Sequence, residues 1–413
     1  MKILAILAGG KGERLRPLTE TRPKPLMPIL GEPIICRHLR MASKHGSYDS
    51  IVILASYMKN RVREGVEECG FDVEIVDQGR ELGTGHAILR VMEAVGPGEY
   101  TVIYSDVYLH EGYYEVLSKA RTPAVLAGVT DRPSEYGVIQ VEDGRLKGVV
   151  EKPREAPGPE AWVFIGGLKL SYDEAIGYLR SLTPSPRGEY EVTDALTMMA
   201  SDYEVEVARG SPEWPWLDIG RPWDLLVANR LALESAEFRG DVYGDVDGRA
   251  SVEGKVYIGE GARVEAYSVV EGPAYIGEGA RVGPNAHIRP YTVMLRGSKA
   301  GFSTQVKASI LMEHSKAPHL NYVGDSILGE HVNLGAGTIT ANLRFDDKPV
   351  KMTVKGVRVD TGMRKLGAVV GGYTKTGINV SIMPGVKIGA HAVIWPGCVV
   401  NRDVGSGEVY KCS

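Results

Sequence analysis

The first residues that could do chemistry stand at the N-terminus, where an apolar segment runs into a glycine-rich turn. Residues 2–8 predict a buried strand, and Gly9-Gly10-Lys11-Gly12 follows directly. Such a turn presents bare backbone N–H groups to phosphate oxygens. Two cations, Arg14 and Lys24, come next. These residues together suit the binding of a nucleoside triphosphate while one of its phosphorus atoms is attacked. A glycine turn alone is weaker evidence, because many such turns only pack a helix on a sheet.

Two aspartates are placed where a metal ion would be held. Asp106 directly follows a predicted strand, 100–105, at the carboxyl edge where open α/β sheets bind ligands. Asp218 lies much later, in Trp216-Leu217-Asp218-Ile219-Gly220. A phosphate monoester attacks a triphosphate only when charge repulsion is neutralised, and two carboxylates with phosphate oxygens form a typical Mg²⁺ shell. Either aspartate could instead begin a turn, but the sequence favours a metal site.

The length and composition of the chain limit the class of protein that carries these residues. A chain of 413 residues exceeds one typical core, so we expect two domains. A net charge of −4 gives no reason to expect nucleic acid, and no apolar run approaches the roughly 20 residues of a membrane span. The N-terminus has no signal-peptide pattern. The scattered cysteines form no Cys-x-x-Cys pair, so we expect neither zinc nor redox chemistry, and a cytoplasmic location; they are Cys36, Cys69, Cys398 and Cys412.

The elements that position the glycine turn and Asp106 alternate up to about residue 235. The apolar patterns predict strands over 51–55, 73–76, 100–105 and 124–129, and helices over 85–95, 113–120 and 225–237. Alternation of this kind predicts a mostly parallel, Rossmann-like sheet with helices on both faces. We therefore expect an α/β domain over residues 1–235.

From residue 240 to 413 the apolar residues instead repeat every six positions. This period fits a coil of three short parallel strands, each sending one aliphatic side chain inward. The matching residues are Val252, Ile258, Val264, Val270, Ile276, Val282 and Ile288, and later Ile382, Ile388, Ile394 and Val400. Glycines directly follow several of these positions, where the chain must turn: Gly259, Gly277, Gly283 and Gly389. The register breaks between about 295 and 370.

The N-terminal motif closely resembles the signature loop of sugar-1-phosphate nucleotidylyltransferases. It comprises Leu-Ala-Gly-Gly-x-Gly-x-Arg-Leu-x-Pro-Leu-Thr from Leu7, with Arg-Pro-Lys-Pro from Arg22. The resemblance implies transfer of a nucleotidyl group to a sugar 1-phosphate with release of pyrophosphate, Mg²⁺ on Asp106 and Asp218, and catalytic roles for Arg14 and Lys24. It implies nucleotide binding by Leu7, Ala8, Gly9, Gly10, Gln78, Gly83 and Thr84, and sugar-phosphate binding by Gly137, Glu151 and Lys152.

The resemblance leaves the substrates open. A glutamine amide reads uracil and thymine alike, because the two bases present the same donor–acceptor face, so UTP and dTTP both fit Gln78. Phe164 stands where the family has an asparagine toward the sugar, which leaves both N-acetylglucosamine 1-phosphate and glucose 1-phosphate. Ser105 replaces the usual glycine before Asp106.

The six-residue period resembles the hexapeptide-repeat left-handed β-helix, and such coils commonly form homotrimers. The segments from His319 to Asp325 and from Asn333 to Asn342 resemble the glucosamine-1-phosphate acetyltransferase domain of the bifunctional bacterial enzyme. This implies that His319 is a general base, which a neutral imidazole suits at physiological pH. It also implies amino-sugar phosphate binding by Arg289, Lys307, Tyr322, Asn333, Asn342 and Lys348, and acetyl-CoA contacts at Ala336 and Gly372.

The whole chain thus resembles the archaeal type of N-acetylglucosamine-1-phosphate uridylyltransferase/glucosamine-1-phosphate N-acetyltransferase. The function implied is a bifunctional transferase of UDP-N-acetylglucosamine synthesis: acetyl-CoA-dependent acetylation of glucosamine or galactosamine 1-phosphate, then nucleotidyl transfer. The alternative is a monofunctional nucleotidylyltransferase whose β-helix is structural or regulatory. A non-catalytic assembly subunit would not need Arg14, Lys24, Asp106 and Asp218 intact.

Overall fold

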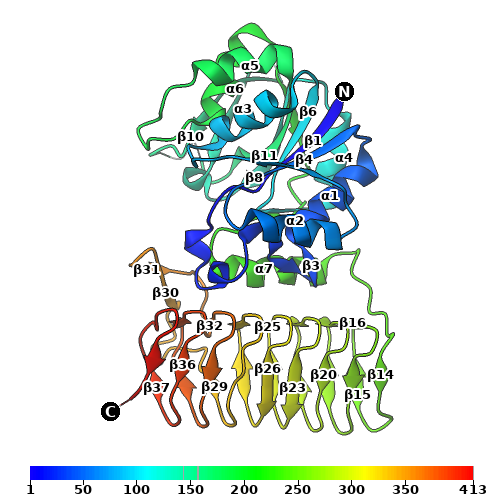
Figure 1. Ribbon diagram of the computed structural model, residues 1–413, viewed down its shortest axis with the longest axis vertical. Coiled ribbons are helices and arrows are strands. Elements are labelled where there is room, and N and C mark those ends of the chain that lie inside the picture. The colour runs from blue at the N-terminus through cyan, green and yellow to red at the C-terminus, as the bar shows by residue number, and fades with distance from the viewer. Residues whose placement is uncertain (143, 156–157, 413) are drawn as a thin grey trace. The chain divides into compact units, whose positions relative to one another are not determined.

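A computed structural model describes residues 1–142, 144–155 and 158–412 (Figure 1). The chain divides into two compact units. The first comprises Met1–Lys11, Pro23–Met27 and Pro33–Asp218, and the second comprises Gly12–Arg22, Pro28–Glu32 and Ile219–Ser413. Two short pieces of the N-terminal sequence therefore group with the C-terminal half, whereas the domain boundary expected from the sequence lies between 235 and 240.

The first unit is built on a mixed sheet in the order β5-β4-β1-β6-β11-β8-β12-β10-β9. Strands β5, β4, β1 and β6 run parallel, but β11 is antiparallel to both β6 and β8, and β9 pairs with β10 as a hairpin. The strands are β1 (Lys2–Leu7), β4 (Ser50–Ala55), β5 (Glu74–Asp77), β6 (Glu99–Tyr104), β8 (Ala124–Thr130), β9 (Gly137–Glu142), β10 (Arg145–Glu151), β11 (Ala161–Ser171) and β12 (Glu206–Arg209). The sequence predicted β1, β4, β5, β6 and β8 to within one residue at each end, whereas it did not predict β9, β10, β11 and β12.

Helices cover both faces of this sheet, because successive side chains of a strand point to opposite sides. On β1, Ile3 and Ala5 join the core beneath α3, α5 and α6, whereas Leu4 and Ile6 join the core beneath α1, α2 and α4. The helices are α1 (Ile34–His45), α2 (Lys59–Glu68), α3 (Thr84–Val95), α4 (Glu111–Lys119), α5 (Tyr172–Ser181) and α6 (Val192–Asp202). The short strands β7 (Val107–Leu109) and β13 (Trp216–Asp218) form a separate antiparallel pair.

The second unit is a coil of short parallel strands with three faces, as predicted. The first face holds β14 (Asp245–Val246), β17 (Arg263–Val264), β20 (Arg281–Val282), β23 (Lys299–Phe302) and β26 (Lys316–His319), then β33 (Lys375–Thr376), β36 (Val393–Ile394) and β38 (Val409–Tyr410). The second face holds β15 (Ser251–Glu253), β18 (Val269–Glu271), β21 (His287–Ile288), β24 (Gln305–Lys307), β27 (Tyr322–Gly324), β29 (Ile339–Thr340), β34 (Ser381–Ile382) and β37 (Val399–Val400). The third face holds β16 (Val256–Ile258), β19 (Ala274–Ile276), β22 (Thr292–Met294), β25 (Ile310–Leu311), β28 (Ile327–Leu328), β32 (Val369–Val370) and β35 (Lys387–Ile388).

The apolar residues that repeat every six positions form the interior of this coil. Ile258, Val270, Ile276 and Ile288 are all completely buried in one continuous apolar core. Where the register was expected to break, the coil in fact continues with altered spacing, through buried residues such as Val306 and Leu311. An antiparallel hairpin then leaves the coil, β30 (Lys351–Val354) with β31 (Val357–Asp360).

The glycines after the inward positions are required by the next coil rather than by a turn. A Cβ on Gly259 would lie 2.8 Å from the backbone nitrogen of Glu278, and one on Gly389 would lie 2.3 Å from that of Ser406. Any side chain there would force neighbouring coils apart. Gly283 also has a φ of +103°, which only glycine adopts freely.

Other segments of the second unit pack on the coil. These are the 3₁₀ helices η1 (Glu13–Leu15) and η2 (Leu18–Glu20), the strand β2 (Pro28–Ile29) and helix α7 (Pro222–Glu234). Arg22 forms ion pairs of 2.6 Å with both Glu313 and Glu330. Burial would lower the pKa of Arg22, but these two carboxylates outweigh it and raise the pKa. The remaining short elements are η3 (Lys24–Leu26), β3 (Glu32–Pro33) and η4 (Pro133–Glu135).

The four cysteines correct the sequence interpretation. Cys36 is bonded to Cys69 in the first unit, and Cys398 is bonded to Cys412 at the end of the coil. The sequence did not predict these two disulfides, because chain folding brings together residues that share no short motif. Of the helices in the described part of the chain, none combines the length and apolar character that a bilayer crossing requires.

Candidate functional site

The glycine turn after β1 opens into a pocket of about 270 Å³ in the first unit. The strands β1 and β6 end here side by side, so their carboxyl ends bring distant residues together. The pocket is lined by Leu7, Gly9, Gly10, Leu54, Gln78, Glu81, Gly83, Thr84, Ala87, Tyr104, Asp106 and Glu189. Six of the seven residues expected to bind nucleotide are among them. The seventh, Ala8, is buried and donates its N–H to the carbonyl of Leu54 at 2.8 Å.

The side chain of Gln78 occupies the space that a side chain at position 9 would need. A Cβ on Gly9 would lie 2.0 Å from the Gln78 Oε1 atom. The amide of Gln78 is therefore packed directly on the glycine turn, and the residue is 7% exposed. At the other side of the pocket Gly83, with a φ of +110°, lies against the backbone of Tyr190. Both glycines shape the space where a base and its phosphates would lie.

The two aspartates meet through β-strand pairing. Strand β13 pairs with β7 so that Asp218 lies opposite Val107, the residue after Asp106. One ammonium contacts both carboxylates: Lys24 donates to Asp106 Oδ2 and lies 3.9 Å from Asp218 Oδ1. Both aspartates are about one-third exposed, at 30%. Hard carboxylate oxygens of this kind fit Mg²⁺.

The two carboxylates do not form a complete metal cage. Within residues 1–142, 144–155 and 158–412, no three His, Cys, Asp or Glu side chains are grouped to hold a metal ion. A cation bound at Asp106 and Asp218 would therefore complete its shell with water and phosphate oxygens, as Mg²⁺ usually does.

A buried imidazole interacts electrostatically with Asp106. His38 on α1 is fully buried, and the hydroxyl of Tyr114 lies 2.9 Å from its Nδ1 atom. Burial, aided by the charge of Arg37 and opposed by Asp106, lowers the pKa of His38 from 6.5 to about 3. The ring is therefore neutral at physiological pH.

Arg14 lies on η1, and its residue is exposed. It belongs to the segment Gly12–Arg22, which groups with the second unit, while Lys24 belongs to the first. Its catalytic role remains a prediction from the motif.

The residues expected on the sugar side adjoin one another at a hairpin end. Glu151, the last residue of β10, lies opposite Gly137, the first of β9, and a Cβ on Gly137 would lie 2.9 Å from Glu151 Oε2. The Glu151 carboxylate pairs with Lys152 at 3.7 Å and with Arg187 at 3.3 Å. Arg187 was not predicted, because it lies in a loop far along the chain with no motif around it.

Phe164 is a core residue rather than a polar contact. It is 8% exposed and packs edge-on against Tyr104, with ring centroids 5.6 Å apart. Tyr104 itself lines the pocket and is half-buried, and burial of its hydroxyl raises its pKa. The position that an asparagine occupies in the family is thus apolar here.

Four polar residues on the second face of the coil form a hydrogen-bonded cluster. Lys307 donates to both oxygens of Asp325, at 3.0 and 2.8 Å. Asn342 donates to Asp325 Oδ2, which also accepts from Lys307, and to the Tyr322 hydroxyl at 3.2 Å. Lys307, Tyr322 and Asn342 were expected at an amino-sugar phosphate site. Asp325, which joins them, was not, since a carboxylate is an unexpected neighbour for a phosphate site.

His319 stands at the end of β26, at the corner between the first and second faces. Its backbone N–H donates to the side chain of Asn321 at 3.0 Å, and the buried Asn321 amide donates in turn to the carbonyl of Gly335 at 2.8 Å. The backbone at His319 is therefore fixed, while the residue is exposed. No other described side chain is hydrogen-bonded to its imidazole, which leaves the ring open to a substrate.

The other expected acetyl-transfer residues are not all together. Asn333 pairs in register with Lys316 and Lys375 on the first face. Ala336 lies at the same corner as His319, since Gly337 donates to the His319 carbonyl at 3.1 Å. Gly372 instead follows β32, at the opposite end of the first-face strands, where a Cβ would lie 2.8 Å from Thr21 Oγ1. Arg289 follows β21 and is half-buried, and Lys348 is exposed before the hairpin.

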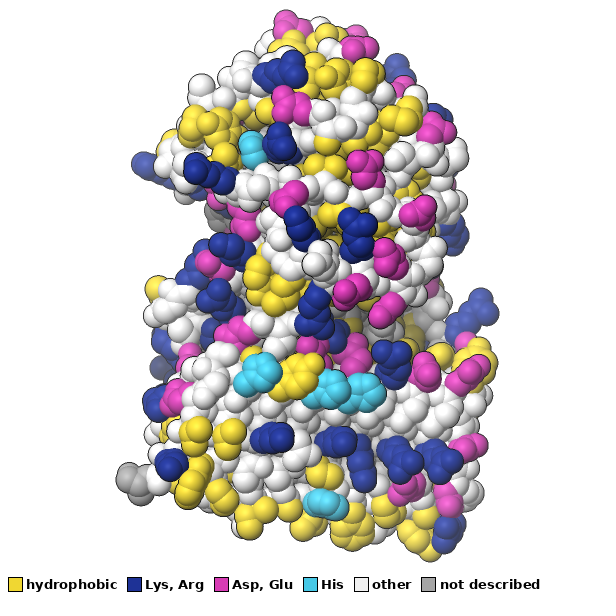
Figure 2. All heavy atoms as spheres, viewed as in Figure 1, with side chains coloured by type: hydrophobic (Ala, Val, Ile, Leu, Met, Phe, Trp, Pro, Cys, Tyr) yellow, Lys and Arg dark blue, Asp and Glu magenta, His cyan; other side chains and the backbone are white. Residues whose placement is uncertain are grey.

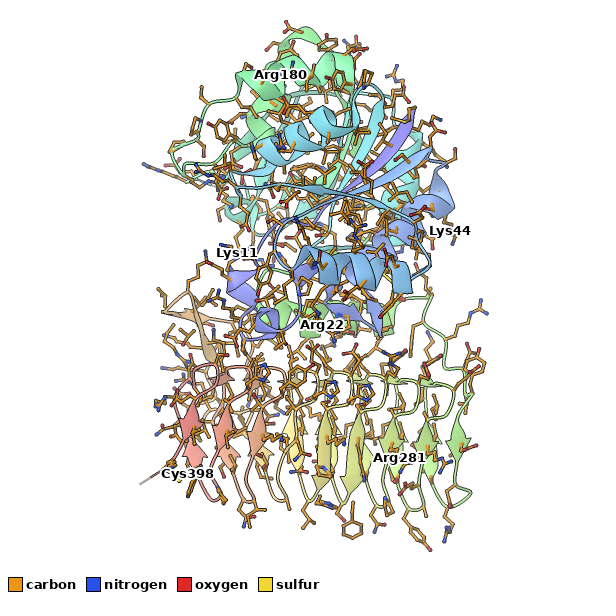
Figure 3. All side chains as sticks on the ribbon, viewed as in Figure 1. Lys11, Arg22, Lys44, Arg180, Arg281 and Cys398 are labelled. Carbon is orange, nitrogen blue, oxygen red and sulfur yellow. A yellow bond between two sulfur atoms is a disulfide. The ribbon has the colours of Figure 1, made fainter. Side chains whose placement is uncertain are left out.

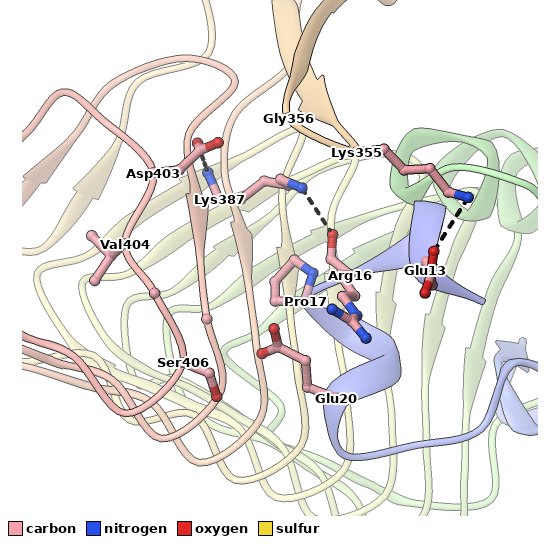
Figure 4. A pocket seen from close by; sticks show the side chains of 12 residues that line it. Glu13, Arg16, Pro17, Glu20, Lys355, Gly356, Lys387, Asp403, Val404 and Ser406 are labelled. Atoms are coloured by element: carbon pink, nitrogen blue, oxygen red, sulfur yellow. Dashed lines mark hydrogen bonds and ion pairs between the residues drawn. The ribbon is translucent and has the colours of Figure 1, made fainter. Parts of the chain in front are cut away.

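A further cavity, of about 470 Å³, lies in the second unit and contains none of the predicted residues (Figure 4). Two of its lysines have partners within it: Lys355 pairs with Glu13 at 3.2 Å, and Lys387 donates to the Arg16 carbonyl at 3.3 Å. Burial lowers the pKa of Lys387. This cavity gives no sign of a ligand.

Comparison with known proteins relates both units to characterised families. Residues 4–235 match the nucleotidyl transferase family, and residues 250–290 and 367–402 match the bacterial transferase hexapeptide family. The "Bifunctional sugar-1-phosphate nucleotidylyltransferase/acetyltransferase" of Sulfurisphaera tokodaii is 45% identical over 98% of this chain and 99% of its own. The "Bifunctional protein GlmU" of Methanocaldococcus jannaschii is 41% identical over 98% and 97%. A solved UDP-glucose pyrophosphorylase in complex with UDP-glucose covers 56% of this chain and 98% of its own, with a TM-score of 0.50 and 23% identity, which supports the fold alone.

Proposed function

Because this chain belongs to the family of bifunctional sugar-1-phosphate nucleotidylyltransferases/acetyltransferases, we propose that it makes a nucleotide sugar in two steps at two sites. The second unit acetylates an amino-sugar 1-phosphate with acetyl-CoA, glucosamine 1-phosphate or galactosamine 1-phosphate. The first unit transfers a nucleotidyl group from UTP or dTTP to a sugar 1-phosphate and releases pyrophosphate.

The nucleotidyl step is carried by the contact of Lys24 with both Asp106 and Asp218 beside the glycine pocket. No protein nucleophile is needed, since a sugar phosphate oxygen attacks the α-phosphorus directly and catalysis is positioning and charge stabilisation. Lys24 and Arg14 stabilise the charge that builds on the phosphates. Asp106 and Asp218 would hold Mg²⁺, which would supply charge neutralisation of the triphosphate.

Recognition of the base and the sugar follows from the pocket. Gln78 faces the base, and the backbone around Gly83 and Thr84 lines the same space. Lys152 holds the attacking phosphate, and Glu151 accepts sugar hydroxyls. Because Phe164 offers no amide, glucose 1-phosphate remains a substrate candidate beside N-acetylglucosamine 1-phosphate.

In the acetyl step, His319 takes the proton from the attacking amine. The cluster at Asp325 holds the amino-sugar phosphate, with Lys307 as its cation. Ala336 is well placed for the acetyl arm, since it shares the corner with His319. Gly372 lies at another corner of the coil, between β32 and β33.

We further propose a homotrimer through the coil. Exposed apolar side chains gather on its last turns, and such patches mark interaction surfaces: Ile339, Val393, Trp395, Val399 and Val409. A cytoplasmic location is the accompanying proposal. Disulfides are rare in most cytosols, with the intracellular proteins of hyperthermophiles as an exception.

The nucleotidyl assignment is tested by Arg14→Ala. Loss of one charge-stabilising donor typically costs about 10²–10³ in kcat, so pyrophosphate release should fall by that factor. Acetyl transfer by the same variant should stay at the wild-type rate, which controls for folding. Near-normal pyrophosphate release would remove Arg14 from the mechanism.

The acetyl assignment is tested with acetyl-CoA and glucosamine 1-phosphate, with release of free thiol as the readout. The wild-type protein should release thiol, and His319→Ala should lose most of it while keeping nucleotidyl transfer. If the natively folded wild-type protein releases no thiol above background, only the nucleotidyl activity stands. Calorimetric titration with UTP against dTTP decides the base.

A further inference from the structure

The segment Gly12–Arg22, which carries Arg14, packs along one edge of the coil within the second unit. Four successive coils each contribute one residue to this edge, the second residue after the third-face strands β25, β28, β32 and β35. We call these residues the anchoring edge: Glu313, Glu330, Gly372 and Ala390. Each of them contacts a residue near the end of the segment.

Arg22 is held by the first two residues of the anchoring edge, and Figure 3 labels it on the segment. Its guanidinium lies 2.6 Å from Glu313 and 2.6 Å from Glu330, and the three side chains are only 14%, 20% and 5% exposed. Burial would raise the pKa of Glu313, but the charge and the hydrogen bonds of Arg22 outweigh burial and lower it. Removing one partner from a buried ion pair is far more disruptive than removing one from an exposed pair.

The other two residues of the anchoring edge are small, and the segment comes close to their backbone. A Cβ on Gly372 would lie 2.8 Å from Thr21 Oγ1, so a side chain there would force Thr21 to move. The N–H of Ala390 donates to Glu20 Oε2 at 2.7 Å. From Arg22 back to Glu20, the segment therefore follows the edge from one coil to the next.

The beginning of the segment is held by the same unit (Figure 4). Lys387, on strand β35, donates to the carbonyl of Arg16 at 3.3 Å. Lys355, at the turn between β30 and β31, pairs with Glu13 at 3.2 Å. The coil and its hairpin thus contact residues on both sides of Arg14.

The anchoring edge is itself rigid, whereas the segment is not a stable element alone. The ring that follows each edge residue, or that of the next coil, stacks on its neighbour with centroids 5.0 Å apart, and Figure 2 shows the histidines of this row in cyan. The segment contains only two 3₁₀ helices of three residues each, η1 and η2. Helices this short have little stability of their own, so the coil must set where the segment lies. The stacked rings are His314, His331, Tyr373 and His391.

We propose that the anchoring edge positions Arg14 for nucleotidyl transfer, so that the coil supplies positioning residues for this reaction besides carrying the acetyl site. The inference rests on the catalytic role proposed for Arg14 and adds what holds Arg14 in place. Glu313 and Glu330 act through Arg22 and the segment. A displacement of about 1 Å at a catalytic group can cost about 10²-fold in rate.

The test neutralises both carboxylates in Glu313→Gln/Glu330→Gln. Pyrophosphate release is measured with the nucleotide and sugar phosphate that the wild-type protein turns over fastest. The kcat should fall about tenfold or more, but no further than in Arg14→Ala. The KM for the nucleotide should stay at the wild-type value, because the residues that line the nucleotide pocket all belong to the first unit.

A double-mutant cycle with Arg14→Ala separates positioning from a general structural role. If the two carboxylates act through Arg14, adding Glu313→Gln/Glu330→Gln to Arg14→Ala lowers kcat no further. A structural effect would instead multiply the two losses. Hydrogen exchange of peptides that cover Gly12–Arg22 should rise in the double variant, which reports the loosened segment directly.

The coil offers a matched control in Glu260→Gln/Glu278→Gln. These carboxylates stand at the same position of two earlier coils, are exposed, and form no ion pair among the described residues. This variant should keep the wild-type kcat and the wild-type exchange of Gly12–Arg22. Thiol release in the acetyl assay reports whether the coil of each variant is folded.

A second variant covers the case in which the double variant does not fold, since it leaves Arg22 buried without its two carboxylates. Glu20→Ala removes the contact with the Ala390 N–H and leaves the ion pairs of Arg22 in place. It should lower kcat by a smaller factor, and again not at all in the Arg14→Ala background.

Three outcomes would overturn the proposal. One is an unchanged kcat in the folded double variant, whether or not its segment exchanges faster. Another is a further fall in kcat on combination with Arg14→Ala, which would mean a route other than Arg14. The third is an equal loss in Glu260→Gln/Glu278→Gln. Failure of the proposed function looks different, because the wild-type protein would then release no pyrophosphate at all.

Discussion

Acidification from pH 7 to pH 5 should weaken the first unit by about 2 kcal/mol through a single residue, His38. Its pKa falls from 6.5 to about 3 in the folded protein, mainly because the ring is buried, with Arg37 adding to the shift and Asp106 opposing it. Its Nε2 atom has no hydrogen-bond partner among the described residues, so a second ring proton would find no acceptor.

The direction of this stability change follows from proton uptake by the unfolded chain. Below pH 6.5 the unfolded chain binds a proton on this imidazole, while the folded chain does not until about pH 3. The folded state therefore loses stability as the pH falls through this window. Each pH unit contributes 1.36 kcal/mol, so the 1.5 units between 6.5 and 5 amount to about 2 kcal/mol.

The measurement compares the wild-type protein with His38→Gln, which keeps an acceptor for the Tyr114 hydroxyl and does not titrate. Urea unfolding is followed by hydrogen exchange of peptides from β1 and β6, so that only the first unit is reported. The wild-type protein should lose about 2 kcal/mol more than the variant between pH 7 and pH 5. Parallel loss in both proteins would refute the argument, because carboxylates elsewhere would then carry the whole pH dependence.

Three further results are expected. Cys398→Ser/Cys412→Ser should lower the unfolding free energy of the coil by about 3 kcal/mol, because the disulfide closes a short loop between residues 14 apart; a reductant should bring the wild-type coil to the same denaturation midpoint and leave the coil of the variant unchanged, since the other disulfide lies in the first unit. Gly9→Ala should raise the KM for the nucleoside triphosphate several-fold, because the new Cβ must displace the Gln78 amide that lies 2.0 Å away, and an unchanged KM with an unchanged melting temperature would contradict the packing of that amide on the turn. Chelation of divalent cations should abolish pyrophosphate release and leave thiol release unaffected, while equal loss of both activities would speak against a metal confined to Asp106 and Asp218.

The local parts of the fold were predictable because they follow from short-range rules. The apolar strand before Gly9 and the six-residue period of the coil both appear in the structure where the pattern placed them, since burial alternates with strand geometry. The position of Asp106 was also predictable, because it directly follows a strand. The hairpin β9–β10 was not predictable, because its strands are only partly apolar and resemble exposed loops.

Parts of the candidate sites depended on long-range pairing. The sequence related Asp218 to Asp106 only through a family resemblance, whereas the structure joins them by the pairing of β13 with β7. Arg187 reaches Glu151, and Asp325 joins Lys307 to Asn342, across gaps that no motif spans. The disulfide partners are likewise set by the packing of segments that share no spacing rule.

One row of outward cations on the first face of the coil shows what the sequence and the structure each determine. Arg263, Arg281 and Lys299 follow one another at intervals of 18 residues, which is three six-residue repeats. The period alone therefore predicts that they align. Lys316 follows after 17 residues and Lys375 only after the hairpin, so their membership depends on where each coil closes. Sequence determines which side chains face inward, because burial has a fixed local period. Tertiary structure decides which outward side chains become neighbours, because that depends on the length of every intervening coil.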